Sequence, residues 1–231
     1  MKFRKSVCSQ AELYECLGDT GYKRHRLQKI ADIIGASSFS LLDVGCGAGQ
    51  FKSASRALLP KMNYSGIDFS EGQVAVARSK GYNVKHHDIT RKWPYKDNTF
   101  DVVFCSEIVE HILDTDFIIA EAYRVLKRSG RIIVTIPNVA SLGDRIRLLF
   151  GIVPSAIENR VFPSSRGHIR AFNYGDLKQL LQDNGFSHIN ITGRDFYLPF
   201  IKYGGPLDWI NKALANLLPK LSAGFIATGT K

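Results

Sequence analysis

The stretch LLDVGCGAG, residues 41–49, is an apolar run that enters a glycine-rich turn. Glycine adopts positive φ without a Cβ clash and lets the backbone approach a ligand closely. We therefore expect a ligand to lie across a turn between a buried strand and a helix. The dinucleotide fingerprint G-x-G-x-x-G is broken because Gln50 stands where its third glycine would be, and no G-K-S/T follows. Nicotinamide dehydrogenases and P-loop nucleotide hydrolases are therefore disfavoured.

The rest of the chain alternates between strand-like and helix-like runs. Strand-like runs occupy residues 40–44, 64–68, 83–87, 101–105, 131–136 and 188–192. Helix-like runs occupy residues 51–59, 71–80, 116–127 and 174–184. This alternation predicts an α/β fold with a parallel sheet and helices on both faces. Without repeats or low-complexity segments, residues 1–231 are predicted to form a single domain that begins with a helical segment at residues 1–38.

Two insertions interrupt the alternation, at residues 137–171 and 194–221. The first is far longer than the usual connection of about 2–6 residues and is predicted to be a lid over a binding pocket. Its apolar residues share one helical face, opposite Asp144 and Arg147; they are Leu142, Ile146, Leu149, Phe150 and Val153. The second repeats this pattern with Leu207, Ile210, Leu214, Leu217, Leu218 and Leu221. Each apolar face can pack on the core, or contact an apolar substrate, a partner subunit or a membrane surface.

Composition limits the kinds of binding partner and the cellular compartment that we expect for this chain. The 31 Lys and Arg residues exceed the 21 Asp and Glu residues, which gives a formal net charge of +10. This charge attracts an anionic substrate, nucleic acid or an acidic membrane, although a solvated basic surface without a partner explains it equally well. Cys8, Cys16, Cys46 and Cys105 have no C-x-x-C spacing and are expected to be reduced thiols. No apolar run reaches the roughly 20 residues of a membrane span, and no signal-peptide pattern opens the chain, so we expect a cytoplasmic protein.

Two aspartates stand where a nucleoside ligand would need carboxylates. Asp43 immediately precedes the glycine turn and can hold a cationic ammonium group, directly or through water. Asp68 ends the next strand, where a carboxylate accepts hydrogen bonds from ribose hydroxyls. Asp101 begins a strand at the opposite end of the sheet and is predicted to be structural.

A candidate catalytic cluster follows the fourth strand. If a helix begins at Glu107, then Glu107, Glu110 and His111 occupy positions i, i+3 and i+4 and project from one face. Two carboxylates and an imidazole can bind a divalent cation or move a proton. Glutamate at a helix start can also be purely structural, because the helix dipole favours it there.

Several motifs together carry a family resemblance. They are D-x-G-x-G-x-G at residues 43–49, FDVV at 100–103, EIVEH at 107–111, RVLK at 124–127 and RIIVTIPN at 131–138. In these motifs the chain, from about Leu41 to Gly185, resembles class I (Rossmann-like) S-adenosylmethionine-dependent methyltransferases. It looks most like their ubiquinone-biosynthesis O-methyltransferase branch. The resemblance implies a doubly wound, mostly parallel seven-stranded sheet whose last strand, at residues 224–230, is antiparallel.

The resemblance also implies a set of site residues. The cofactor S-adenosylmethionine would contact the glycine turn, both aspartates and the ends of the next strands: Asp43, Gly45, Cys46, Gly47, Gly49, Asp68, Phe69, Asp88, Ile89 and Cys105. Asp88 and Ile89 would hold the adenine. The E-x-x-E-H run is similar to that of metal-using ubiquinone O-methyltransferases and small-RNA terminal ribose methyltransferases. There, a histidine from the next insertion, here His168, can join Glu107, Glu110 and His111 around an ion such as Mg²⁺.

The leading interpretation is O-methylation of a small, lipid-like or aromatic metabolite, with His111 and Glu107 as catalytic residues. RNA ribose methylation is an alternative that the basic surface and the E-x-x-E-H run favour. Stacked aromatics or an appended domain usually accompany RNA binding, and neither is evident. A cofactor-binding or assembly protein without turnover is a third interpretation. The patterns leave the acceptor atom, the use of a metal and the oligomeric state open.

Overall fold

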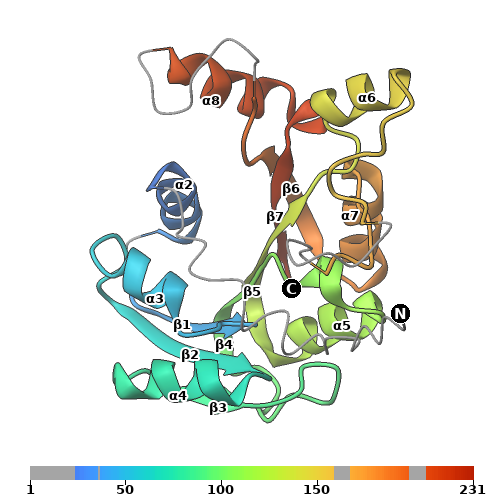
Figure 1. The fold of residues 1–231 in the computed structure, drawn as a ribbon. Coiled ribbons are helices and arrows are strands. Elements are labelled where there is room, and N and C mark those ends of the chain that lie inside the picture. Colours follow the sequence, from blue (N-terminus) through green and yellow to red (C-terminus); the bar gives the residue numbers. More distant parts are fainter. Residues whose placement is uncertain (1–23, 36, 159–166, 198–206) are drawn as a thin grey trace, which may run out of the picture.

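The computed structural model describes residues 24–35, 37–158, 167–197 and 207–231, which build a seven-stranded sheet flanked by helices (Figure 1). The strands are β1 Phe39–Val44, β2 Met62–Asp68, β3 Val84–His86, β4 Phe100–Ser106, β5 Leu126–Pro137, β6 Ser187–Gly193 and β7 Gly224–Thr230. Residues 1–23 of the predicted N-terminal helical segment, with Cys8 and Cys16, lie outside the described residues. So do residues 159–166 and 198–206 of the two insertions.

The sheet order is β3-β2-β1-β4-β5-β7-β6. Neighbouring strands pair in parallel from β3 to β5, whereas β7 is antiparallel to both β5 and β6. The predicted mixed sheet with an antiparallel last strand is confirmed. Because the carboxyl ends of the parallel strands meet at one edge, the turns that follow β1, β2, β4 and β5 converge there.

Seven helices and two 3₁₀ turns are described within these ranges. They are α2 Arg24–Ile34, α3 Gln50–Ser55, α4 Glu71–Ser79, η1 Val109–His111, α5 Thr115–Val125, α6 Leu142–Leu149, α7 Tyr174–Asp183, α8 Asp208–Leu217 and η2 Pro219–Leu221. Four helices begin at a polar side chain that accepts a backbone N–H of the first turn. These capping residues are Ser70, Asp114, Ser141 and Asn173.

The apolar side chains form one core on each face of the sheet. In β1, Leu41 belongs to the core that α2, α3 and α4 cover, whereas Leu42 belongs to the core under α5 and α7. Both leucines are fully buried. Coverage on both faces explains why the central strands are apolar without alternation.

The largest differences between predicted and observed element ends occur at two places. The helix predicted to reach residue 127 ends at Val125, and β5 begins at Leu126 instead of Arg131. Leu126 pairs with Phe100 of β4. Pairing within the sheet therefore overrides the helical preference of the local sequence at residues 126 and 127. α3 ends at Ser55, earlier than the predicted residue 59. Among the described residues, none of the helices has the length and apolar composition needed to cross a bilayer.

Candidate active site

A cavity of about 990 Å³ lies over the carboxyl ends of the central strands, within the usual size of a small-molecule site. It brings together most of the predicted site residues: Asp43, Gly45, Cys46, Gly47, Asp68, Phe69, Glu107, His111 and His168. Residues that were not predicted to be site residues complete its wall, among them Gln73, Asn138, Arg26, Arg194 and Tyr197. The sequence gives no local signal for these, because they enter from separate elements.

The glycine turn requires glycine at three positions. Gly45, Gly47 and Gly49 have φ of 70°, 51° and 74°, in the left-handed region that other residues rarely adopt. A Cβ on Gly45 would lie 2.7 Å from Ile108, and one on Gly49 would lie 2.5 Å from Tyr82. Gly49 therefore serves the packing of α3 and does not line the cavity, whereas Gly45 and Gly47 form its floor.

Asp68 ties the glycine turn to the end of β2. One carboxylate oxygen accepts the N–H of Gly47 at 2.7 Å, and the other accepts the N–H of Ser70 at 2.9 Å. Burial raises the pKa of Asp68, and these backbone donors oppose that shift. A carboxylate has about four acceptor positions, so Asp68 retains lone pairs with which to accept ribose hydroxyls.

Asp43 is a buried carboxyl on the cavity wall. It accepts the hydroxyl of Tyr64 at 2.9 Å. Burial raises its pKa to about 7, against the opposing effect of the Tyr64 hydrogen bond. A cationic group beside Asp43 would favour the ionised form, so this carboxyl fits the ammonium of an amino acid.

Besides Gly49, three of the predicted cofactor contacts lie outside the cavity wall. The Asp88 side chain is half-exposed and accepts hydrogen bonds from the N–H and the hydroxyl of Thr90. It also forms an ion pair with Arg91 at 3.4 Å. Ile89 is buried in the core, and its carbonyl accepts the indole N–H of Trp93. Cys105 is fully buried in β4, where burial raises the pKa of its thiol. The roles of Asp88, Ile89 and Cys105 in cofactor binding stay predictions.

No helix begins at Glu107, so the condition under which Glu107, Glu110 and His111 would share one helical face is not met. Glu107 has a φ of +52°, and only a short 3₁₀ turn, η1, begins at Val109. The N–H of Glu107 donates to the carbonyl of Thr135 of β5 at 2.9 Å, so this backbone group bonds to the sheet and not within a helix. Glu107, Glu110 and His111 therefore do not share one helical face, although Glu107 and His111 both line the cavity.

Glu107 belongs to a charge network that the sequence did not reveal. Its carboxylate forms an ion pair with the buried Arg194, which also donates to Asp195 at 3.0 Å. The carboxylate of Asp195 in turn forms hydrogen bonds with Arg26 and His25 of α2. Burial alone would raise the pKa of Glu107, but the charge of Arg194 outweighs it and holds the pKa below its usual value. This pairing separates Glu107 from the predicted metal-binding set.

Glu110, His111 and His168 form a compact cluster whose ligand atoms all lie within 4.8 Å of one another. His111 Nδ1 lies 3.0 Å from the carbonyl of Gly167, and His168 Nδ1 lies 3.2 Å from that of Ala156. Because a carbonyl only accepts, each Nδ1 donates a hydrogen bond, and Nε2 is the nitrogen that a neutral ring would offer to a proton or a metal ion. Carbonyl anchoring of one ring nitrogen is the arrangement typical of metal-binding histidines.

The ionisation of this cluster follows from burial. Among the residues that the structure describes, no group donates a hydrogen bond to the buried carboxylate oxygens of Glu110. Burial and the nearby charge of Glu107 raise the pKa of Glu110 well above its usual value. Burial lowers the pKa of His111 to about 4, so its imidazole is neutral at neutral pH. The cluster therefore offers either a buried neutral acid beside an imidazole base, or three ligand atoms to a cation.

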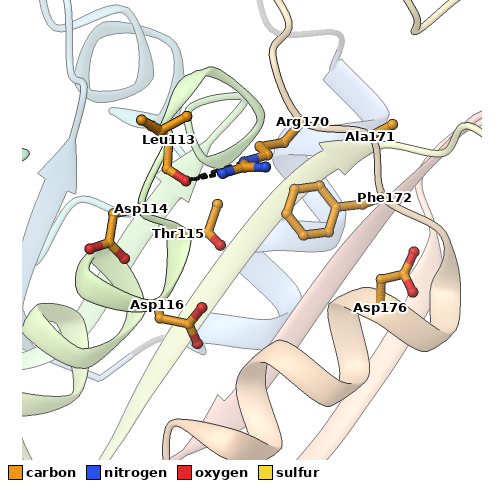
Figure 2. A pocket seen from close by; sticks show the side chains of 8 residues that line it. All are labelled: Leu113, Asp114, Thr115, Asp116, Arg170, Ala171, Phe172 and Asp176. Atoms are coloured by element: carbon orange, nitrogen blue, oxygen red, sulfur yellow. Dashed lines mark hydrogen bonds between the residues drawn. The ribbon is translucent and has the colours of Figure 1, made fainter.

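A second cavity lies beside the segment that follows His168. It has a volume of about 440 Å³ and lies beside Leu113 and Arg170 (Figure 2). Arg170 donates to the carbonyl of Leu113, and the N–H groups of Ile169 and Arg170 donate to the carbonyl of Glu110. The carboxylates of Asp114 and Asp176 in its wall are occupied in capping α5 and α7. We therefore interpret this cavity as structural.

Comparisons with known proteins agree with the geometry. Residues 42–134 match the family described as "Methyltransferase domain". The chain is 31% identical over 119 residues to the ubiquinone biosynthesis O-methyltransferase of Pseudomonas savastanoi pv. phaseolicola, which covers 49% of this chain and 50% of that protein. It is 29% identical over 171 residues to the demethylmenaquinone methyltransferase of Staphylococcus aureus, with 67% and 70% covered.

The fold comparison extends over nearly the whole chain. A SAM-dependent methyltransferase from Archaeoglobus fulgidus superposes with a TM-score of 0.63 at 20% identity, over 90% of this chain and 92% of that chain. This likeness concerns the fold alone. The chain spans about half the length of the ubiquinone-biosynthesis relatives that it matches.

Proposed function

We propose that this chain, which carries a methyltransferase domain at residues 42–134, transfers the methyl group of S-adenosylmethionine to a hydroxyl of a small, lipid-like or aromatic acceptor. One observation carries the proposal: a neutral imidazole, His111, lines the same cavity as the glycine turn. We also infer that residues 1–231 act as one catalytic domain, with the two insertions on the acceptor side.

The residues on the cavity floor fit the cofactor. Gly45 and Gly47 form the floor, where a Cβ would clash with Ile108 or Gln50. Asp68 would accept the ribose hydroxyls, and Asp43 would face the ammonium group. The cofactor supplies an electrophilic methyl group on a sulfonium. The protein's task is to align a nucleophile with that methyl group and to keep water away.

His111 would accept the proton of the acceptor hydroxyl. Its Nδ1 is fixed by Gly167, so Nε2 is the basic nitrogen. The charges of Glu107 and Glu158 favour the protonated ring that results. An oxygen acceptor benefits from such a base more than a carbon or amine acceptor does, which supports O-methylation.

The names of the two relatives support a quinone precursor as acceptor. One is a ubiquinone biosynthesis O-methyltransferase and the other a demethylmenaquinone methyltransferase. A phenolic ring on an apolar tail matches the lipid-like or aromatic acceptor that the insertions suggest.

A second candidate mechanism places a divalent cation at Glu110, His111 and His168. The orphaned carboxylate of Glu110 and the two anchored imidazoles favour it. Two imidazoles suit Zn²⁺, Mn²⁺ or a similar ion better than Mg²⁺, which prefers oxygen ligands. In that case His111 would be a ligand, and Glu107, already paired with Arg194, would not.

Methyl transfer from radiolabelled S-adenosylmethionine tests the proposal, with a catechol, demethylmenaquinone and an amine as acceptors. We expect the catechol to be methylated and His111→Ala to lose about 10²–10⁴-fold in turnover. If His111 is the base, His168→Ala and a chelator leave most of the activity. If a cation is used, Glu110→Gln, His168→Ala and the chelator all abolish activity, and a divalent ion reverses chelation. Cofactor binding without transfer to any acceptor would favour the non-catalytic interpretation.

A further inference from the structure

Helix α6 buries its polar face and exposes its apolar face, the reverse of the usual orientation of an amphipathic helix. Its polar residue Asp144 is only 4% exposed and accepts the hydroxyl of Ser141 and the N–H of Ser155. Its apolar residues point outward, with Leu149 82% and Phe150 76% exposed. The core-packing alternative for this apolar face is therefore wrong.

The apolar surface continues beyond α6. Ile146, Leu148, Ile152 and Val153 are also exposed, so the whole turn after the helix is apolar on its outside. Figure 1 shows α6 and α8 at the same end of the molecule, and α8 adds Trp209, which is 64% exposed, and Leu217. Large apolar patches of this kind mark interaction sites.

The charges of this surface decide between possible partners. Arg145 and Arg147 are exposed between the apolar residues of α6. Between residues 139 and 157, all of which the structure describes, the only carboxylate is the buried Asp144. A second copy of the chain would bring the same positive charges against itself, whereas an anionic lipid surface would complement them.

The same helix also forms a wall of the cavity. Gly143, Asp144 and Arg147 line it from the inside, while Leu149 and Phe150 lie outside. A surface that held the outer residues would thus lie next to the acceptor end of the cavity.

We propose that this docking surface, formed by residues 145–153 with Trp209 and Leu217 of α8, binds the face of an anionic membrane. Leu149 and Phe150 enter the headgroup region, and Arg145 contacts lipid phosphates, whereas Arg147 faces the cavity and Asp144. Docking brings a membrane-dissolved acceptor to the cavity. That purpose rests on the proposed function, but the binding itself needs no turnover.

Co-sedimentation with vesicles tests the proposal. The probes are vesicles of equal parts phosphatidylglycerol and phosphatidylcholine, and vesicles of phosphatidylcholine alone. We expect preferential binding to the anionic vesicles that weakens with added salt. The double variant Leu149→Ser/Phe150→Ser should bind at least about tenfold more weakly. Val76→Ser, an apolar-to-serine change at an exposed position of α4, should bind like the wild type.

Three results would overturn the proposal. They are equal sedimentation of the wild type and the double variant, a wild-type dimer that the double variant dissociates, and retention on RNA in place of vesicles. The rise in melting temperature with S-adenosylhomocysteine tests the proposed function independently of membrane binding. We expect the double variant to keep the wild-type shift, because neither residue lines the cavity.

Discussion

The two ends of the cavity are built differently. At the glycine turn, local backbone conformation sets the geometry: Gly45 and Gly47 have positive φ, and Asp68 bonds directly to the turn. Beside Glu107, which we propose to be the acceptor end, charged side chains distant in sequence set the geometry, such as Glu107 with Arg194. The comparison teaches that a ligand site made by backbone can be predicted from a short motif, whereas one made by distant charge pairs cannot.

The sharpest test of this contrast is to remove Arg194. We expect Arg194→Met to lower the free energy of unfolding by about 1–3 kcal/mol, because Glu107 loses its ion-pair partner and the buried Asp195 keeps only Arg26 and His25. Lys127→Met is the matched control, since Lys127 pairs with Asp101 near the surface and its loss should cost about 1 kcal/mol or less. Urea denaturation measures both. Equal losses would show that the buried network does not stabilise the acceptor end.

A smaller effect is expected from adding one methyl group to the glycine turn. Gly45→Ala combines a positive φ with a clash against Ile108, so we expect its affinity for S-adenosylhomocysteine to fall about tenfold or more. Gly81 has a similar φ of 79° with open space around its Cβ position. Gly81→Ala should therefore lose stability without losing affinity. Calorimetric titration of both variants measures whether a loss of affinity comes from the positive φ, which both glycines share, or from the position of Gly45 on the cavity floor. Unchanged affinity in Gly45→Ala would mean that the ligand binds elsewhere.

The smallest predicted effect concerns pH. Because the pKa of Asp43 is raised to about 7, the carboxyl is mostly protonated below that pH and ionised above it. An ammonium group prefers the ionised form, so affinity for S-adenosylhomocysteine should rise by about tenfold from about pH 6 to pH 8. Asp43→Asn should give a flat profile.

The same shift predicts a stability change of the opposite sign. A folded-state pKa above the unfolded value means that stability is lost as pH rises through about 7. Without ligand, Asp43→Asn should therefore become more stable than the wild type as the pH is raised. Parallel melting curves with pH for the two proteins would contradict a buried, titrating Asp43.

Much of the fold could be predicted from the sequence. Central strands covered on both faces are continuously apolar, and glycines with positive φ marked the turn, so the sheet and the positions of Asp43 and Asp68 followed. The absence of a helix at Glu107 could not be anticipated, because pairing with Thr135 overrides the local pattern. The outward face of α6 was likewise hidden, since periodicity gives the two faces of a helix without saying which one is buried.

Calorimetric titration of the purified chain with S-adenosylhomocysteine tests the central claim most directly. We predict one molecule bound per chain with a dissociation constant on the order of micromolar, and loss of that binding in Asp68→Ala while its melting transition remains cooperative. A folded wild-type chain that releases no heat and shows no change in melting temperature at millimolar ligand would contradict the account.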